Sequence, residues 1–286
     1  MTARVLSGTE AAGVWRAEIA GRVGALAAEG KRVGLATLLV GDDPASAVYV
    51  RNKHKAAEAA GMRSFDHRLP ATATQGEVEG LVHRLNDDDA VDGYIVQLPL
   101  PDHLDSGPVL LGIDAAKDAD GLHPVNLGRM ILDVLAPRPA TPTGILRLLD
   151  HYGILTRGLK AVVVGRSTLV GRPLSVMLGS KGRDATVTVA HTGTADLVEV
   201  TREADLLFVA AGRAGLITGA HVKPGAFVID AGTNSVDGHL IGDAVFDEVT
   251  AVAAGVTPVP GGVGPMTIAG LLHNTVLIAE GAFRLP

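Results

Sequence analysis

The sequence predicts an α/β fold built on parallel sheets, and two observations carry this prediction. Short apolar runs alternate with longer helical stretches along the chain, as expected for successive βαβ units. Between them, residues 99–144 are rich in proline and have the character of loops, which indicates a domain boundary. A length of 286 residues suits one large domain or two small ones.

The first half predicts three helices and three strands. Asp43 is a good N-cap and Pro44 suits a first helical position, so a helix begins there and ends near Ala60, before Gly61. The other predicted elements of this half are helices over 8–30 and 74–85 and strands over 33–40, 65–69 and 91–98. After the proline-rich middle we expect a helix over 143–152, strands over 159–164, 185–190, 205–209 and 226–229, and a last helix over 265–282.

Composition excludes several function classes. The chain has no cysteine, which excludes disulfides, thiolate metal sites and a thiol nucleophile. A formal net charge of −6 without a run of Lys or Arg argues against nucleic acid or an anionic membrane as the main partner. No apolar stretch has signal-peptide or transmembrane character, so we expect a soluble, cytoplasmic protein. No pair of histidines has H-E-x-x-H spacing, and no metal site is expected.

The segment KAVVVGRSTLVGRP predicts a phosphate-binding turn between a buried strand and a helix. Gly165 and Gly171 would let backbone approach a pyrophosphate, and the helix N-terminus would offer free N–H groups. Because the spacing is not G-x-G-x-x-G, an ordinary strand-to-helix turn stays open. No acidic residue ends the next strand, whereas Arg166 lies in the turn, so NADP is favoured over NAD. Asp196 would upset this interpretation if it turned towards the ribose.

A second group of polar residues suits proton transfer. Tyr49 and Lys53 are four residues apart on a predicted helix and share one face, although such a pair also occurs on ordinary helix surfaces. Short-chain dehydrogenases use this spacing after their glycine-rich turn, but here the pair precedes that turn. Gln97 ends a strand and Asp120 lies in a polar loop, and an amide and a carboxylate in such places could bind the donor and acceptor edge of a heterocycle. Asp118 and Asp120 could instead cap a turn.

Six segments in order carry a resemblance that covers about residues 5–282: VGDDPASAVYVRNKHKAAEAAGM, DGYIVQLPLP, KDADGLHPVNLGR, TPTGIL, VVVGRSTLVGRP and TPVPGGVGPMT. The chain resembles the bifunctional methylenetetrahydrofolate dehydrogenase/methenyltetrahydrofolate cyclohydrolase family. That resemblance implies two α/β domains separated by a cleft. Residues 1–138 plus 265–286 would form a folate-binding catalytic domain, and residues 139–264 a Rossmann-like NADP domain.

The resemblance also assigns site residues. Lys53 matches the family's catalytic lysine, Tyr49 the tyrosine beside the pterin, Gln97 the glutamine that tunes the lysine, and Asp120 the aspartate that binds the pterin. The other implied substrate contacts are Leu98, Pro260, Gly261 and Gly262. The implied cofactor contacts are Gly165, Arg166, Ser167, Gly171, Thr192 and Thr233. Thr192 stands in His191-Thr192-Gly193-Thr194, where the family usually has H-S-x-T.

The function implied is oxidation of 5,10-methylenetetrahydrofolate with NADP, followed by hydrolysis to 10-formyltetrahydrofolate. The implied setting is a cytoplasmic homodimer in tetrahydrofolate interconversion, which supports purine, methionine and histidine biosynthesis. Two alternatives stay open. One is a dehydrogenase without hydrolase activity, using NADP or NAD, and the other is a folate-binding protein that has lost catalysis.

Overall fold

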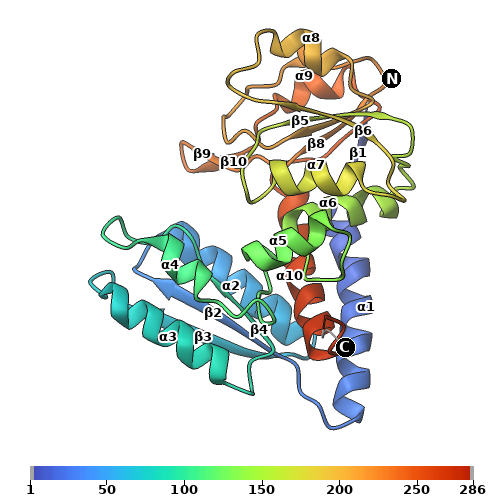
Figure 1. The fold of residues 1–286 in the computed structure, drawn as a ribbon. Coiled ribbons are helices and arrows are strands. Elements are labelled where there is room, and N and C mark those ends of the chain that lie inside the picture. The colour runs from blue at the N-terminus through green and yellow to red at the C-terminus, as the bar shows by residue number, and fades with distance from the viewer. Residues whose placement is uncertain (1–2, 284–286) are drawn as a thin grey trace. The chain divides into compact units, whose positions relative to one another are not determined.

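The computed structural model describes residues 3–283 as two compact α/β units (Figure 1). Met1–Gly13 and Thr141–Thr267 form one unit, named here the six-stranded unit after its main sheet. Val14–Ala140 and Ile268–Pro286 form the other, the three-stranded unit. The predicted α/β class with parallel sheets is confirmed. Residues 3–13 fall in the six-stranded unit, whereas the resemblance implied that they belong with residues 14–138.

The three-stranded unit carries a small parallel sheet of order β3-β2-β4. Its central strand β2 (Gly34–Val40) is buried along its whole length, and β3 (Arg63–Leu69) is the edge strand beside it. The third strand, β4 (Gly93–Val96), is extended by a single parallel bridge from Tyr94 to Asp118. Among the described residues, the helices that lie wholly in this unit are α2 (Pro44–Ala59), α3 (Gln75–Asp87), α4 (Ser106–Leu111) and α5 (Pro124–Ile131).

Helices α2 and α3 pack on opposite faces of this sheet. Ala36 and Leu38 of β2 share a buried cluster with the apolar face of α3, which consists of Val78, Leu81, Val82 and Leu85. The intervening residue Thr37 points to the other face and bonds to a side chain of α2. The ends of both helices follow local signals. Asp43 accepts from the Ser46 N–H at the start of α2, and Thr74 forms a capping box with Glu77 in α3.

The six-stranded unit has a parallel sheet of order β1-β11-β8-β7-β5-β6. Its strands are β1 (Arg4–Val5), β5 (Lys160–Val164), β6 (Thr186–Ala190), β7 (Leu206–Val209), β8 (Phe227–Asp230) and β11 (Gly255–Val256). Alternate residues of β5 enter different cores: Val162 and Val164 join one cluster, Ala161 and Val163 the other. Both faces of the sheet are therefore covered, as in a doubly wound, Rossmann-like fold.

Helices in this unit are α7 (Gly171–Gly179), α8 (Leu197–Arg202), α9 (Phe246–Thr250) and the 3₁₀ turn η1 (Gly219–His221). A two-stranded hairpin of β9 (Asn234–Val236) and β10 (His239–Ile241) is antiparallel. The unit boundaries fall inside or at the edge of three further helices: α1 (Gly8–Ala28), α6 (Ala140–His151) and α10 (Val263–Ala279). Within residues 3–283, no helix combines the length and apolar character that crossing a bilayer requires.

Each sheet has a switch point where successive connections leave in opposite directions. In the three-stranded unit β2 is followed by β3 on one side and β4 lies on the other, and in the six-stranded unit β5 has the same relation to β6 and β7. Ligands of open parallel sheets bind at the carboxyl ends of strands beside such points. Ligand-binding residues are therefore expected at the carboxyl ends of β2 and β4 and at the carboxyl ends of β5 and β7.

The structure differs from the sequence expectations chiefly in short elements. The proline-rich stretch 99–144 holds α4 and α5, where the sequence indicated only loops, because Asp105 and His123 supply N-caps and Pro124 begins α5. The expected strand 91–98 covers only Gly93–Val96, and the last helix runs from Val263 to Ala279 in place of 265–282. The expected helix 143–152 begins earlier, at Ala140.

Candidate active site

A lysine–glutamine contact lies at the carboxyl end of β4 in the three-stranded unit. Lys53 Nζ on α2 donates a hydrogen bond of 3.0 Å to Oε1 of Gln97. The glutamine is itself fixed, because its Nε2 donates to the Leu98 carbonyl at 2.8 Å and its backbone N–H donates to Leu38 of β2, also at 2.8 Å. Tyr49 lies one helical turn before Lys53 on α2, with 38% of its surface exposed.

The two aspartates of the KDADG segment have different surroundings. Asp118 is buried, and its carboxylate accepts from the backbone N–H of Gly121 and His123 and from the side chain of Asn126. It caps the turn, which is the role that the sequence allowed for it. The Asp120 carboxylate has no hydrogen-bond partner among residues 3–283, although its backbone carbonyl accepts from Ala140. Asp120 is therefore the carboxylate that remains available to a ligand.

Burial favours the neutral forms of both Lys53 and Asp120. It lowers the pKa of Lys53, with the nearby Asp120 carboxylate opposing the shift. It raises the pKa of Asp120, with Lys53 opposing and Asp118 adding to the rise. A lysine amine of lowered pKa, held by an amide oxygen, is better suited than an exposed lysine to accept a proton. The arrangement is that of a proton-transfer site beside a carboxyl group that can still form hydrogen bonds.

The glycine-bearing turn follows β5 in the six-stranded unit. Gly165 has a φ of +122°, and a Cβ there would lie 2.1 Å from the Ala210 carbonyl that follows β7. A Cβ on Gly171 would lie 2.1 Å from the Gly165 carbonyl. Only glycine fits at positions 165 and 171. The backbone of this turn therefore lies close against the chain that follows β7, at the switch point between β5 and β7.

The free N–H groups of this turn are not those that the sequence indicated. Ser167 Oγ accepts from Val170 and Gly171, and the Ser167 carbonyl accepts from Arg172, so the first N–H groups of α7 are occupied. Within the described chain, the N–H groups of residues 166–169 have no partner. The Arg166 side chain is exposed, with no ion pair or side-chain hydrogen bond among residues 3–283. Successive free N–H groups and a free guanidinium are donors suited to an anion.

Other predicted cofactor contacts surround the same edge of the sheet. Thr192 follows β6 and Thr233 follows β8, and both are exposed. Asp196, which could have turned to a ribose, instead caps α8 by accepting from the Glu199 N–H at 2.9 Å. The acidic residue that would have favoured NAD is thereby engaged elsewhere.

Two buried aspartates that the sequence does not reveal hold the loops at this edge. Asp243 is fully buried and accepts from the N–H groups of Ala211 and Gly212, just after β7, and from the Asn234 side chain. Asp230, at the end of β8, accepts from the N–H groups of Gly232, Asp243 and Ala244. Burial raises the pKa of Asp230 to about 6. Their only sequence signal is a strand-ending Asp in IDAGTN, because most of their partners are backbone groups brought close by the fold.

The predicted loop Pro260–Gly262 lies in the six-stranded unit, immediately before α10. The Gly261 carbonyl accepts from the Thr9 N–H at 3.0 Å. A Cβ on Gly8 would lie 1.7 Å from the Gly262 carbonyl, so the start of α1 can approach this loop only because residue 8 is glycine. The contact of this loop with substrate stays a prediction. Among residues 3–283, no three His, Asp or Glu side chains group as a metal site would require.

Comparison with known proteins decides the family. The tetrahydrofolate dehydrogenase/cyclohydrolase catalytic domain matches residues 6–120, and the NAD(P)-binding domain of the same family matches residues 139–283. This chain belongs to the tetrahydrofolate dehydrogenase/cyclohydrolase family. The residue groups described above divide in the same way: Lys53, Gln97 and Asp120 lie in or at the end of the catalytic-domain match, and the turn after β5 lies in the NAD(P)-binding match.

Individual relatives agree over nearly the whole length. The bifunctional protein FolD of Nitratidesulfovibrio vulgaris is 52% identical over 280 residues, which are 97% of this chain and 97% of the relative. The crystal structure of the FolD methylenetetrahydrofolate dehydrogenase/cyclohydrolase of Campylobacter jejuni has a TM-score of 0.93 at 43% identity, covering 97% of this chain and 99% of that one. The Trypanosoma brucei enzyme, solved with NADP and an inhibitor, has a TM-score of 0.93 at 39% identity and covers 100% of both chains.

Proposed function

We propose that this protein oxidises 5,10-methylenetetrahydrofolate to 5,10-methenyltetrahydrofolate with NADP and hydrolyses the product to 10-formyltetrahydrofolate. Membership of the dehydrogenase/cyclohydrolase family supports both activities. The observation that carries the hydrolytic half is the contact between Lys53 and Gln97, in surroundings that lower the pKa of the lysine. A protein that only bound folate would gain nothing from a lysine made ready to accept a proton.

The turn after β5 fits NADP. Gly165 and Gly171 leave room that any Cβ would fill, and the unpartnered N–H groups of residues 166–169 in the described chain suit a pyrophosphate. Arg166, with the hydroxyls of Ser167 and Thr192, would hold the 2′-phosphate through charge-assisted bonds. Thr233 would contact the cofactor at the neighbouring strand end. NADP held there would supply the acceptor for the hydride that the bridging methylene carbon loses on oxidation.

The hydrolytic step would use the chain's own groups. The methenyl carbon is electrophilic, so water attacks it and loses a proton, for which neutral Lys53 is the acceptor. The bond from this carbon to N5 of the folate then breaks as the new O–H becomes a carbonyl. N5 takes up that second proton, and the formyl group stays on N10. Gln97 holds the amine in position through its amide oxygen. Asp120, raised in pKa and without a hydrogen-bond partner among residues 3–283, would bind the donor and acceptor edge of the pterin. Tyr49 would orient the ring or relay a proton, and Leu98, Pro260, Gly261 and Gly262 would line the substrate's surroundings.

One assay tests both activities. Purified protein is mixed with 5,10-methylenetetrahydrofolate and either NADP or NAD, and reduced nicotinamide and methenyl absorbance are both followed. NADPH formation without methenyl accumulation is the expected result. NADPH with accumulating methenyl product would mean a dehydrogenase that lacks the hydrolytic activity. Folate binding without reduction of either cofactor would mean a protein that has lost catalysis.

We also propose an assembly and a setting. A homodimer in the cytoplasm, serving tetrahydrofolate interconversion and through it purine, methionine and histidine biosynthesis, fits the family. Light scattering of the purified protein tests the assembly, with about twice the 29.3 kDa chain mass expected. A mass of one chain would refute the homodimer.

A further inference from the structure

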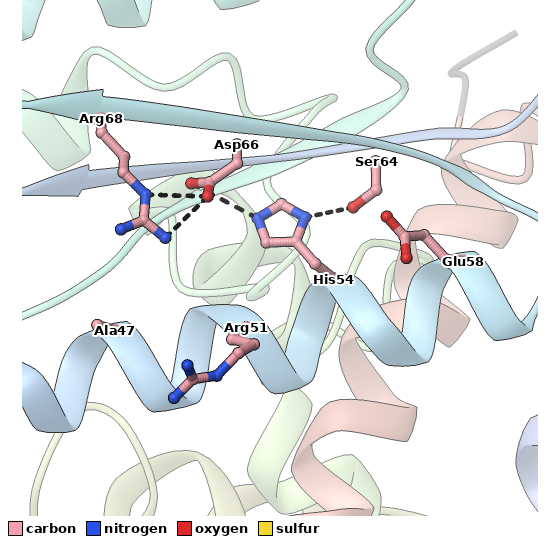
Figure 2. Close-up of a pocket in the computed structure, with 7 residues that line it drawn as sticks. All are labelled: Ala47, Arg51, His54, Glu58, Ser64, Asp66 and Arg68. Carbon is pink, nitrogen blue, oxygen red and sulfur yellow. Dashed lines mark hydrogen bonds and ion pairs between the residues drawn. The ribbon is translucent and has the colours of Figure 1, made fainter.

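The residue after Lys53 makes a set of contacts that the reaction does not use. His54 lies in a pocket of about 320 Å³ between α2 and the edge strand β3 (Figure 2). The pocket is lined by one face of α2 and alternate residues of β3, namely Ala47, Arg51, His54, Glu58, Ser64, Asp66 and Arg68. Figure 2 shows the imidazole lying between Ser64 and Asp66.

Both ring nitrogens of His54 are engaged by the sheet. Nε2 forms a 2.8 Å hydrogen bond with Oγ1 of Thr37, which is fully buried on the central strand β2. Nδ1 is hydrogen-bonded to the Ser64 hydroxyl on β3. Asp66, also on β3, lies 3.7 Å from Nε2 and is itself paired with Arg68. One side chain thus ties α2 to two neighbouring strands.

These bonds suit a neutral imidazole. Burial lowers the pKa of His54; Asp66 and Glu58 oppose the shift, and Arg68 and Lys53 add to it. A neutral ring has one donor and one acceptor, and a hydroxyl can take either role. Thr37 and Ser64 therefore satisfy the ring in either tautomer.

Lys53 and His54 contact different strands of the sheet. Consecutive helix residues are separated by about 100° around the axis. Lys53 reaches Gln97 at the end of β4, and His54 reaches Thr37 and Ser64 on β2 and β3. The sheet order is β3-β2-β4, so Lys53 is bonded towards one edge of the sheet, and His54 is bonded to the central strand and the other edge. Together these contacts fix the rotation of α2 about its own axis.

We propose that His54 is a positioning residue for Lys53. By holding the rotation of α2, His54 keeps the lysine amine against Gln97. The inference rests on the proposed hydrolytic function. If the His54 contacts are lost, α2 can turn, and Lys53 leaves the position that hydrolysis needs. Hydride transfer does not use the lysine as a base and should be affected far less.

The test compares variants in two assays: hydrolysis of 5,10-methenyltetrahydrofolate without nucleotide, and NADPH formation. Thr37→Val keeps the shape of the buried site but removes the hydroxyl, and should lower the hydrolytic kcat by about 10- to 100-fold with KM little changed. Ser64→Ala should cost less, because water can replace a partly exposed hydroxyl. His54→Gln, whose amide can still reach Thr37, should retain more hydrolysis than His54→Phe. Arg51→Ala, in the same pocket, is the matched control and should change neither activity.

A pH profile separates positioning from a general structural role. If Lys53 leaves its buried position, its pKa rises towards that of an exposed lysine, and the hydrolysis profile of Thr37→Val should move to higher pH. Equal loss of both activities with an unmoved profile would overturn the inference, as would full hydrolysis in Thr37→Val and His54→Phe. Absence of hydrolysis in the unmodified protein would instead refute the proposed function itself.

Discussion

The two units place polar groups at the same point of a parallel sheet but use them differently. In the three-stranded unit, Lys53 of α2 contacts Gln97 at the end of β4, and burial disfavours the charged forms of Lys53 and of nearby Asp120. In the six-stranded unit the end of β5 presents backbone N–H groups and an exposed Arg166. The first arrangement suits proton transfer and the second suits binding an anion. One topology can therefore support chemistry or binding, depending on the residues that the surrounding helices and loops bring to the end of the strand.

The buried carboxylates repeat the contrast. Asp120 has no hydrogen-bond partner within the described chain, whereas Asp230 accepts three backbone N–H groups and holds neighbouring loops together. A carboxylate left without partners is available to a ligand, and one with three is part of the framework. Substitutions should therefore separate the two activities by unit.

The largest separation is expected for Lys53→Met. Removing the proton acceptor should lower methenyl hydrolysis by about 1,000-fold, within the usual range for a general base. Hydride transfer should remain within a few-fold, because it depends on the placement of two rings. Steady-state assays of both reactions on one preparation measure this. Equal loss of both activities at unchanged folate affinity would sink the division of roles.

Asp230→Asn tests the framework role through pH. The pKa of Asp230 in the folded protein, about 6, lies above the ordinary 3.8. Between about pH 4 and 6 the folded protein therefore keeps a proton on Asp230 that the unfolded chain has released. This group's contribution to the free energy of unfolding is present below pH 4 and is lost as pH rises through 6, by about 3 kcal/mol in all. Urea unfolding of both proteins from pH 4 to 7 should show the difference between them changing over that window. If the free energies of unfolding of the two proteins change in parallel from pH 4 to 7, Asp230 does not have a raised pKa in the folded protein.

Arg166→Ala should separate the two cofactors. Loss of a charge-assisted bond to the 2′-phosphate costs about 1.5–3 kcal/mol, so the KM for NADP should rise by about 10- to 100-fold. The KM for NAD and the rate of methenyl hydrolysis without nucleotide should stay as they are. An equal rise for NAD and NADP would mean that Arg166 supports the turn and does not bind the phosphate.

The smallest effect is expected for Thr74→Ala, which removes the capping box of α3. It should lower the free energy of unfolding by about 1 kcal/mol, the usual cost of a lost N-cap. Both activities should be unchanged at temperatures well below unfolding, which makes the variant a control for stability loss alone. A selective loss of hydrolysis here would show that the Lys53 site responds to any weakening of its unit.

Local signals predicted the elements that local chemistry determines. Asp43, Pro44 and Gly61 bound α2, and the structure confirms each of these roles. By contrast β1 and β11 are two residues long and exist only through pairing with each other and with β8, which no local pattern reveals. The short helices α4 and α5 were hidden because proline-rich sequence was interpreted as loop.

In the candidate site too, local sequence indicates some features, and others depend on contacts that only the fold brings together. Lys53 and Tyr49 share a helix face that the residue spacing indicates. The bond from Lys53 to Gln97 spans 44 residues, so no local pattern shows it; the family resemblance implied it and the structure confirms it. Without the resemblance, which selected Asp120, the residues alone could not tell Asp118 from Asp120, since the difference lies in which carboxylate the turn's own N–H groups reach. The roles of Asp243 and His54 likewise depend on partners brought together by the fold.

The role of Lys53 is tested most sharply by the pH dependence of methenyl hydrolysis by the unmodified protein without nucleotide, corrected for the reaction in buffer. We predict that kcat rises with pH along a single titration that lies below the ordinary lysine pKa of 10.5, because the acceptor is Lys53 in its buried position. The same titration should be absent in Lys53→Met. Hydrolysis that keeps its rate and its pH profile in that variant would show that the proton is transferred to another group.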